Sequence, residues 1–261
     1  MKPAIIIPLF TYVNIAIFVW DWYLGCYPDY RLKHLNMKNV VAFLKDIKNN
    51  NDKKWFDAHK GEYLKAKEEM DDFALQLIDG IASFDESVKG LTLRDTTYRI
   101  YRDIRFSPDK TPYKTHMGVY VCKGGKKSGN AGYYFHVEPG GESLLGGNLI
   151  SSGLYMPDPK ALKSMREDIL YNGEEFLAAL HAAKGFELSR ENSLKKVPSG
   201  YPADSPYAEY LKLKDVYLEK HFGDNMLMDK DLLKIIVDAF RTTYPLIEHL
   251  NRAVEYAREE M

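Results

Sequence analysis

The chain has 261 residues, of which 45% are hydrophobic and 28% are charged, the proportions of an ordinary folded domain. These proportions exclude a disordered chain, a collagen-like fibre and a protein with many membrane spans. The 36 basic and 37 acidic residues leave a net charge of −1, so no overall field draws the chain to nucleic acid or lipid. Two cysteines, Cys26 and Cys122, are too few for a disulfide framework, and we expect a cytoplasmic protein.

Residues 3–20 carry no charged side chain and are mostly apolar, and their number is close to the ~20 residues that a membrane-spanning helix needs. Trp20 and Trp22 lie where a spanning segment would place interfacial aromatic rings. The basic residues downstream predict that an anchored chain would keep its main part on the cytoplasmic side of the inner membrane. Membrane contact is therefore expected only through residues 3–20.

Two other interpretations account for the same segment. A secretory signal would need small residues at a cleavage site, and residues 21–27 offer a poor one. Alternatively, translation starts at Met37, because an ordinary helix begins directly after that residue. We favour the start at Met37 over the single anchor, and the anchor over export. The expected organisation is a hydrophobic extension over residues 1–36 and a single domain over residues 37–261.

Helical spacing of apolar residues predicts the first helix of the domain, which should end at the asparagines of residues 49–51. Its apolar positions are Val40, Val41, Phe43, Leu44 and Ile47. Asp52 is placed to cap a second helix, which we expect to run over residues 53–82 with an apolar stripe from Phe56 to Ile81.

From residue 97 the pattern changes to short runs rich in Tyr, Phe, Val and Gly, separated by turn signals. We expect antiparallel strands over residues 117–123, 133–138 and 143–150. Helices are expected over residues 160–170, 173–183 and 207–212, with a strand over 216–222 and a final helix that begins at Asp229 and kinks at Pro245. Helices at both ends of a strand block predict an α+β fold, with an antiparallel central sheet flanked by N-terminal and C-terminal helices.

Several common catalytic and cofactor motifs are missing from the sequence. There is no Cys-x-x-Cys, no His-Glu-x-x-His, no Gly-x-Ser-x-Gly and no Gly-x-Gly-x-x-Gly after a strand. We therefore expect no metal and no cofactor, although enzymes of other kinds stay open.

Residues 94–127 hold nine basic and three acidic side chains, a surplus of six positive charges in a chain whose net charge is −1. Arginine binds phosphate or carboxylate with two parallel hydrogen bonds, and lysine adds charge. The residues that we expect to bind an anionic, phosphate-bearing ligand are Arg99, Arg102, Arg105, Lys110, Tyr113 and Lys114. In the structural alternative, the arginines pair with nearby aspartates and support a long loop.

His116, His136 and Glu138 are the candidate catalytic residues. His116 follows the basic segment, where a histidine can exchange protons near pH 7. On a strand, His136 and Glu138 share one face with Tyr134 and could act in acid–base chemistry or bind a metal. We favour the structural alternative for His136, in which a neighbouring Tyr or Glu satisfies its hydrogen bonds.

Six segments together have a specific pattern: residues 55–60 (Trp-Phe-Asp-Ala-His-Lys), Tyr63, residues 98–116, residues 132–134 (Gly-Tyr-Tyr), Glu138-Pro139 and Tyr155-Met156-Pro157. They resemble an uncharacterised protein family of bacteria and fungi that is catalogued as domain of unknown function 2461. The resemblance runs from about Val40 to the C-terminus, and similar proteins begin close to the position of Met37. Because the family has no established activity, the resemblance implies no catalytic residues.

The leading hypothesis from the sequence is a domain that binds an anionic small molecule or a phosphate group through residues 98–116. A hydrolase or transferase that acts on a phosphorylated small molecule is the first alternative. A nucleic-acid or protein-interaction module is the second, with nucleic acid as a possible partner. The sequence does not indicate an oligomeric state.

Overall fold

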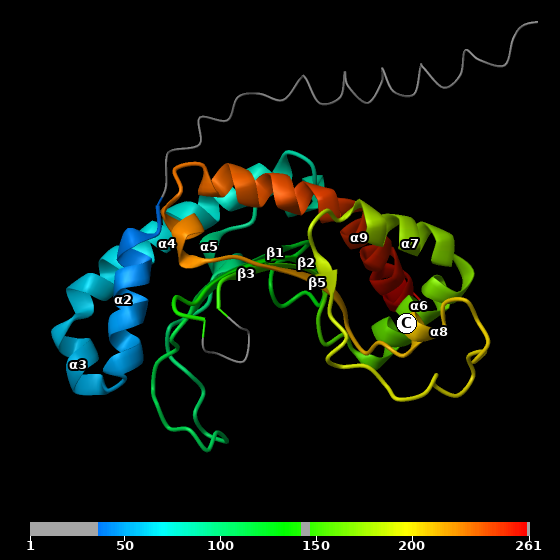
Figure 1. Cartoon of the computed structure of the whole chain (residues 1–261), viewed down its shortest axis with the longest axis horizontal. Coiled ribbons are helices and arrows are strands. Elements are labelled where there is room, and N and C mark those ends of the chain that lie inside the picture. Colours follow the sequence, from blue (N-terminus) through cyan, green and yellow to red (C-terminus); the bar gives the residue numbers. More distant parts are fainter. Residues whose placement is uncertain (1–35, 142–146, 260–261) are drawn as a thin grey trace, which may run out of the picture. The chain divides into compact units, whose positions relative to one another are not determined.

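The computed structural model describes residues 36–141 and 147–259, all within the compact unit Leu32–Met261 (Figure 1). The N-terminal part contains α2 (Lys38–Asn49), α3 (Lys53–Ala58), α4 (Lys60–Ala82), the 3-10 helix η1 (Glu86–Val88) and α5 (Leu93–Thr96). The remaining elements are β1 (Met117–Cys122), β2 (Gly132–Val137), β3 (Leu149–Leu154), α6 (Pro159–Tyr171), α7 (Gly173–Ala182), β4 (Glu187–Leu188), α8 (Ala208–Leu211), β5 (Val216–His221), the 3-10 helix η2 (Asp224–Met228) and α9 (Leu232–Glu259).

The hydrophobic extension expected over residues 1–36 lies outside the described residues apart from Asn36, so the start at Met37 and the membrane anchor stay predictions. Within the part of the chain that the structure describes, no helix is long and apolar enough to cross a membrane. Met37 is fully buried, and its amide donates to the carbonyl of Leu227 at 3.0 Å, which joins the start of the domain to η2.

The five strands form one sheet in the order β1-β2-β3-β5-β4, and every pair in it is antiparallel. Helices precede and follow the strands, so the fold is α+β, as the sequence predicts. β4 has only two residues and pairs with the outer side of β5. The sequence did not predict this edge strand.

One face of the sheet packs against the helices α4 and α9, which lie together over it in Figure 1. Side chains on successive strand residues point to opposite faces, so alternate residues enter the core. Tyr133 and Phe135 on β2 are fully buried there. The Phe135 ring lies 4.5 Å from that of Phe73 on α4, and the Tyr133 ring 5.4 Å from that of Phe240 on α9. The opposite face meets loops instead of helices.

Residues 53–82 form two helices, where the sequence predicted one. Asp52 caps α3 as expected, because its carboxylate accepts from the amide of Trp55 at 2.9 Å. At His59 the backbone leaves the helical conformation, with φ −106° and ψ 19°. The His59 Nδ1 atom lies 2.8 Å from the carbonyl oxygen of Trp55, and the two rings stack at 4.2 Å. This local side-chain interaction ends α3 and turns the chain into α4.

The third strand was predicted over residues 143–150 and lies over Leu149–Leu154 instead, and residues 142–146 are outside the described part of the chain. Its Ser-Ser-Gly run does not read as a strand, since strands favour branched and aromatic residues. Ser152 faces the helices, and there Thr243 on α9 donates a hydrogen bond to its hydroxyl at 2.8 Å. A hydrogen bond thus lies at this core position of β3, where strand patterns lead one to expect an apolar side chain.

The C-terminal elements lie close to their predicted positions. The helices α6, α7 and α8 and the strand β5 agree with the expected ranges to within one residue at each end. α9 begins at Leu232, three residues after the predicted start at Asp229. It continues through Pro245 and changes direction between its orange and dark red parts in Figure 1, as a residue without an amide hydrogen favours.

Replacement of Gly153 by Ala should destabilise the sheet. Gly153 has φ +148°, and a Cβ atom there would lie 2.2 Å from the carbonyl oxygen of Val216 on β5. We expect the free energy of unfolding to fall by about 2 kcal/mol or more, from backbone strain and overpacking. Urea unfolding followed by circular dichroism measures this change.

Gly61→Ala is the matched control, because Gly61 is exposed on α4 and nothing lies within 4 Å of its added methyl group. Alanine favours the helix, so stability should be equal or slightly higher. An equal effect of both substitutions would contradict the assigned pairing of β3 with β5.

Candidate functional site

The face of the sheet away from α4 and α9 holds a cleft of about 450 Å³, a size usual for small-molecule sites. Its floor comes from alternate strand residues, namely Gly118, Tyr120, Tyr134, Leu149, Ser151 and Gly153. One wall is formed by Tyr98, Arg99, Lys114, His116 and Lys126, and the opposite wall by Tyr155, Glu191, Asn192, Tyr217 and Glu219. Four strands and four loops therefore converge on this cleft.

Tyr134 lies across the floor of the cleft, over Gly118 on the neighbouring strand. A Cβ atom at Gly118 would lie 2.6 Å from the Tyr134 hydroxyl, so the glycine leaves room for the ring. The hydroxyl is 2.9 Å from Nδ1 of His136. Burial raises the pKa of Tyr134, which keeps its hydroxyl protonated at pH 7.

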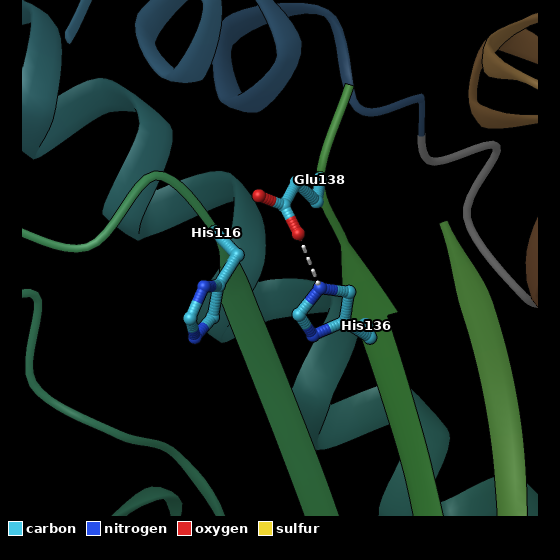
Figure 2. A group of neighbouring side chains, drawn as sticks. All are labelled: His116, His136 and Glu138. Atoms are coloured by element: carbon cyan, nitrogen blue, oxygen red, sulfur yellow. Dashed lines mark hydrogen bonds and ion pairs between the residues drawn. The ribbon is translucent and has the colours of Figure 1, made fainter. Parts of the chain in front are cut away.

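His136 continues a polar chain from Tyr134 to Glu138. Its Nε2 atom lies 3.2 Å from Oε2 of Glu138, and both side chains are buried (Figure 2). The ring of His116 lies beside that of His136, with 4.7 Å between centroids. Burial, followed by the neighbouring His136, lowers the pKa of His116 to about 4. His116 is therefore neutral near pH 7, where the sequence led us to expect proton exchange.

The wall that contains Tyr98 carries three positive side chains, Arg99, Lys114 and Lys126, and two of them lie over the Tyr98 ring. The Nζ atoms of Lys114 and Lys126 lie 5.3 and 5.6 Å from the ring centroid of Tyr98. Burial and then the neighbouring charge of Arg99 lower the pKa of Lys114. Among the described residues, neither Arg99 nor Lys114 forms an ion pair with a carboxylate. Two cations without an ion pair among the described residues thus line the cleft.

The opposite wall is acidic and aromatic. Glu191 and Glu219 line it, and burial is the main cause that raises the pKa of Glu219. The ring of Tyr155 packs edge to face against that of Tyr217, with 5.6 Å between centroids. The buried carboxylate of Asp215 accepts from the amide of Met156 at 2.7 Å and from the side chain of Asn192 at 2.5 Å, which fixes two loops of this wall together.

The expected ligand-binding residue Tyr113 anchors the basic loop to the domain. It is buried, and its ring stacks on that of Phe56 in α3 at 4.1 Å. The side chain of Asn51 bonds both backbone groups of Tyr113, accepting from its amide at 3.0 Å and donating to its carbonyl at 2.9 Å. These contacts hold the base of the loop where Lys114 reaches the cleft.

Three other expected ligand-binding residues contact the loop itself. Arg102 pairs with Asp109 and also donates to Thr111. Hydrogen bonds from the amide of Thr111 and then from Arg102 lower the pKa of Asp109 to about 2. Arg105 pairs with Asp103 at 2.6 Å. Lys110 donates to the carbonyl of Ile104 at 3.0 Å. The expected ligand-binding residues therefore fall into two groups. Arg99 and Lys114 line the cleft, whereas Arg102, Arg105 and Lys110 do not.

A larger hollow, of about 980 Å³, lies on the other side of Tyr98, along the outer edge of β1. Tyr98, Arg99 and Lys126 line both spaces. We place the candidate site in the smaller cleft, because the aromatic floor, the unneutralised cations and the chain from Tyr134 to Glu138 converge there.

Cys122 is a poor candidate for a nucleophile. Its thiol is buried, and burial raises its pKa to about 11. The reactive thiolate is therefore scarce at pH 7.

The sequence gave no indication of the acidic wall. Tyr217 and Glu219 alternate on β5, which is the pattern of a strand with one free face, but no local feature joins them to β2. Lys126 and Tyr98 belong to the basic segment, but only the structure shows that the Lys126 Nζ atom lies over the Tyr98 ring. No sequence feature at Asn192 or Tyr155 predicted that these residues line a cleft.

The fold is α+β, and the free face of its sheet carries a polar, aromatic cleft. A model of a conserved hypothetical protein family, domain of unknown function 2461, matches residues 39–249. The chain belongs to this family, as the arginine and lysine motif indicated. No curated protein and no solved structure matches the chain.

Arg102→Gln and Lys114→Gln should affect stability in opposite ways. Loss of Arg102 removes the partner of Asp109 and Thr111, so we expect a lower melting temperature. Loss of Lys114 relieves a half-buried charge that faces Arg99, so the melting temperature should be unchanged or higher. Differential scanning calorimetry at pH 7 compares both variants with the wild type. A large loss of stability in Lys114→Gln would show that this lysine supports the fold.

Proposed function

We propose that this protein binds a small anionic molecule, such as a phosphomonoester, in the cleft on the free face of its sheet. Arg99, Lys114 and Lys126 bind the anionic group, and the tyrosines of the floor pack against the rest of the molecule. The observation that carries the proposal is the pair Arg99 and Lys114, which line one wall without a carboxylate partner among the described residues.

Electrostatic energy supports this assignment. Lys114 is half-buried, and burial and then the nearby charge of Arg99 lower its pKa, so its charged form costs energy in the empty cleft. An anion bound beside these two side chains offsets this cost and gains charge-assisted hydrogen bonds. The aspartates of the loop do not fill this role, since Asp103 and Asp109 pair with Arg105 and Arg102.

The opposite wall indicates the rest of the ligand. Glu191, Glu219 and Asn192 offer acceptors and one amide, which suit hydroxyl or amino groups. The faces of Tyr134, Tyr155 and Tyr217 suit a sugar ring or a flat heterocycle. A ligand with a phosphate at one end and hydroxyl or amino groups at the other therefore matches both walls.

Lys114→Gln should weaken phosphate binding without harm to the fold. We expect the Kd for inorganic phosphate to rise at least ~10-fold, because a hydrogen bond to a charged group contributes about 1.5–3 kcal/mol. Isothermal titration calorimetry in the presence of a metal chelator measures the Kd.

Lys110→Gln is the matched control, with the same change of charge in the same loop but outside the cleft. Its Kd should stay within about twofold of the wild type, since exposed charges contribute little. Chloride at equal ionic strength corrects for the general effect of salt. Equal losses in both variants, or salt-sensitive binding of oligonucleotides instead of phosphate, would contradict the proposal.

A second candidate is an enzyme that acts on the same ligand. The chain of hydrogen bonds from Tyr134 through His136 to Glu138 favours it, because such a chain can move a proton at the cleft floor. Tyr134→Phe removes the hydroxyl and keeps the ring. Mass spectrometry of a panel of phosphomonoesters should then show chemical change with the wild type and little with Tyr134→Phe. Unchanged compounds with both proteins leave binding as the function.

A further inference from the structure

The pairing of β1 with β2 brings three metal-ligating side chains to one place. Met117 lies opposite Val137 and Gly118 opposite His136, so one further step of the register sets His116 opposite Glu138. Residues 116, 136 and 138 then lie on the same face of the sheet, the face that holds the cleft. This explains why residues from two distant segments meet without any local sequence motif.

The distances fit a single ion. One nitrogen of each histidine and one oxygen of Glu138 lie within 4.8 Å of one another, and Nε2 of His136 is 3.2 Å from Oε2 of Glu138. Ligand atoms in a tetrahedral zinc site, with bonds of ~2.0–2.1 Å, are about 3.4 Å apart. His136 and Glu138 already have this spacing. A small rotation of His116, which is only partly buried, brings the third ligand into range.

Neighbouring side chains orient two of the three ligands. The Tyr134 hydroxyl lies 2.9 Å from Nδ1 of His136, which leaves Nε2 to face Glu138. The hydroxyl of Thr115 donates to Oε1 of Glu138 at 3.2 Å, and Oε2 lies toward Nε2 of His136. Outer hydrogen bonds of this kind fix the ring orientation and the tautomer of histidines that bind metals.

We propose that His116, His136 and Glu138 form a three-ligand site for a divalent transition metal, of which Zn²⁺ is the best fit. Two imidazoles and one carboxylate suit Zn²⁺ and related ions, whereas Mg²⁺ prefers oxygen ligands. Three protein ligands leave one coordination position, and His116 lines the cleft, so that position is reached from the cleft. The proposal does not depend on anion binding by Arg99 and Lys114. It replaces the expectation of no metal, which considered only ligands close in sequence.

Metal titration of the full-length protein tests the site. After removal of metals with a chelator that is then dialysed away, competition with a chromophoric zinc indicator should show one Zn²⁺ per chain and no effect of millimolar Mg²⁺. Co²⁺ in place of Zn²⁺ should give the visible absorption of a tetrahedral site, which adventitious surface binding does not produce.

Two variants test the ligands, and a third is the control. Glu138→Gln keeps the shape and removes the charge, and His116→Ala changes a partly buried side chain, so folding is checked by circular dichroism in both. Each should weaken Zn²⁺ binding at least ~10-fold and abolish the Co²⁺ spectrum, because loss of one ligand costs at least as much as loss of an outer partner. His181→Ala, at an exposed position of α7, should bind as the wild type does. Absence of stoichiometric Zn²⁺ binding in the wild type, or unchanged binding in folded Glu138→Gln and His116→Ala, would overturn the proposal. Phosphate binding is measured with chelator present, so its outcome is independent of this one.

Discussion

The antiparallel register of β1 and β2 is the constraint on which both the core and the candidate site depend. Because side chains alternate along a strand, one set of positions enters the core beneath α4 and α9, and the other set faces the cleft. Tyr133 and Phe135 belong to the first set, and Tyr134 and His136 to the second. A shift of one residue would exchange the two sets, so burial of the core fixes the site geometry as well.

The charged side chains of the basic loop fall into two groups, those paired within the loop and those that line the cleft. The base of the loop is held by the ring of Tyr113 on Phe56 and by the two hydrogen bonds from Asn51. Farther along the loop, Arg102 pairs with Asp109 and Arg105 with Asp103, so their charges stay within the loop. Of the arginines and lysines expected to bind the ligand, Arg99 and Lys114 line the cleft. The structural alternative therefore holds for Arg102 and Arg105, whereas anion binding by Arg99 and Lys114 is the proposal made above.

The cleft carries features that cost stability when it is empty. Burial and then the nearby charge of Arg99 lower the pKa of Lys114, and burial raises the pKa of Glu219 on the opposite wall. The large buried side chains of α2, α4 and α9 offset such costs, since each fully buried apolar side chain contributes ~1.5–3 kcal/mol. Groups that oppose folding and yet line a cavity are typical of binding sites.

The sequence by itself determined the fold class, most helix positions, the basic segment and the family. Periodicity is local, so Val40 to Ile47 predicted α2, and Asp52 predicted the cap of α3. Periodicity gave the wrong element where a single side-chain interaction outweighed the local pattern. His59 divides the helix expected over residues 53–82, and Ser152 bonds with Thr243 in the core. Only the tertiary structure decided which charges remain without a partner and which residues meet. Pairing register and loop packing join segments far apart in the chain, as with His116 and Glu138 or Tyr134 and Glu219, and no spacing within the sequence encodes those distances.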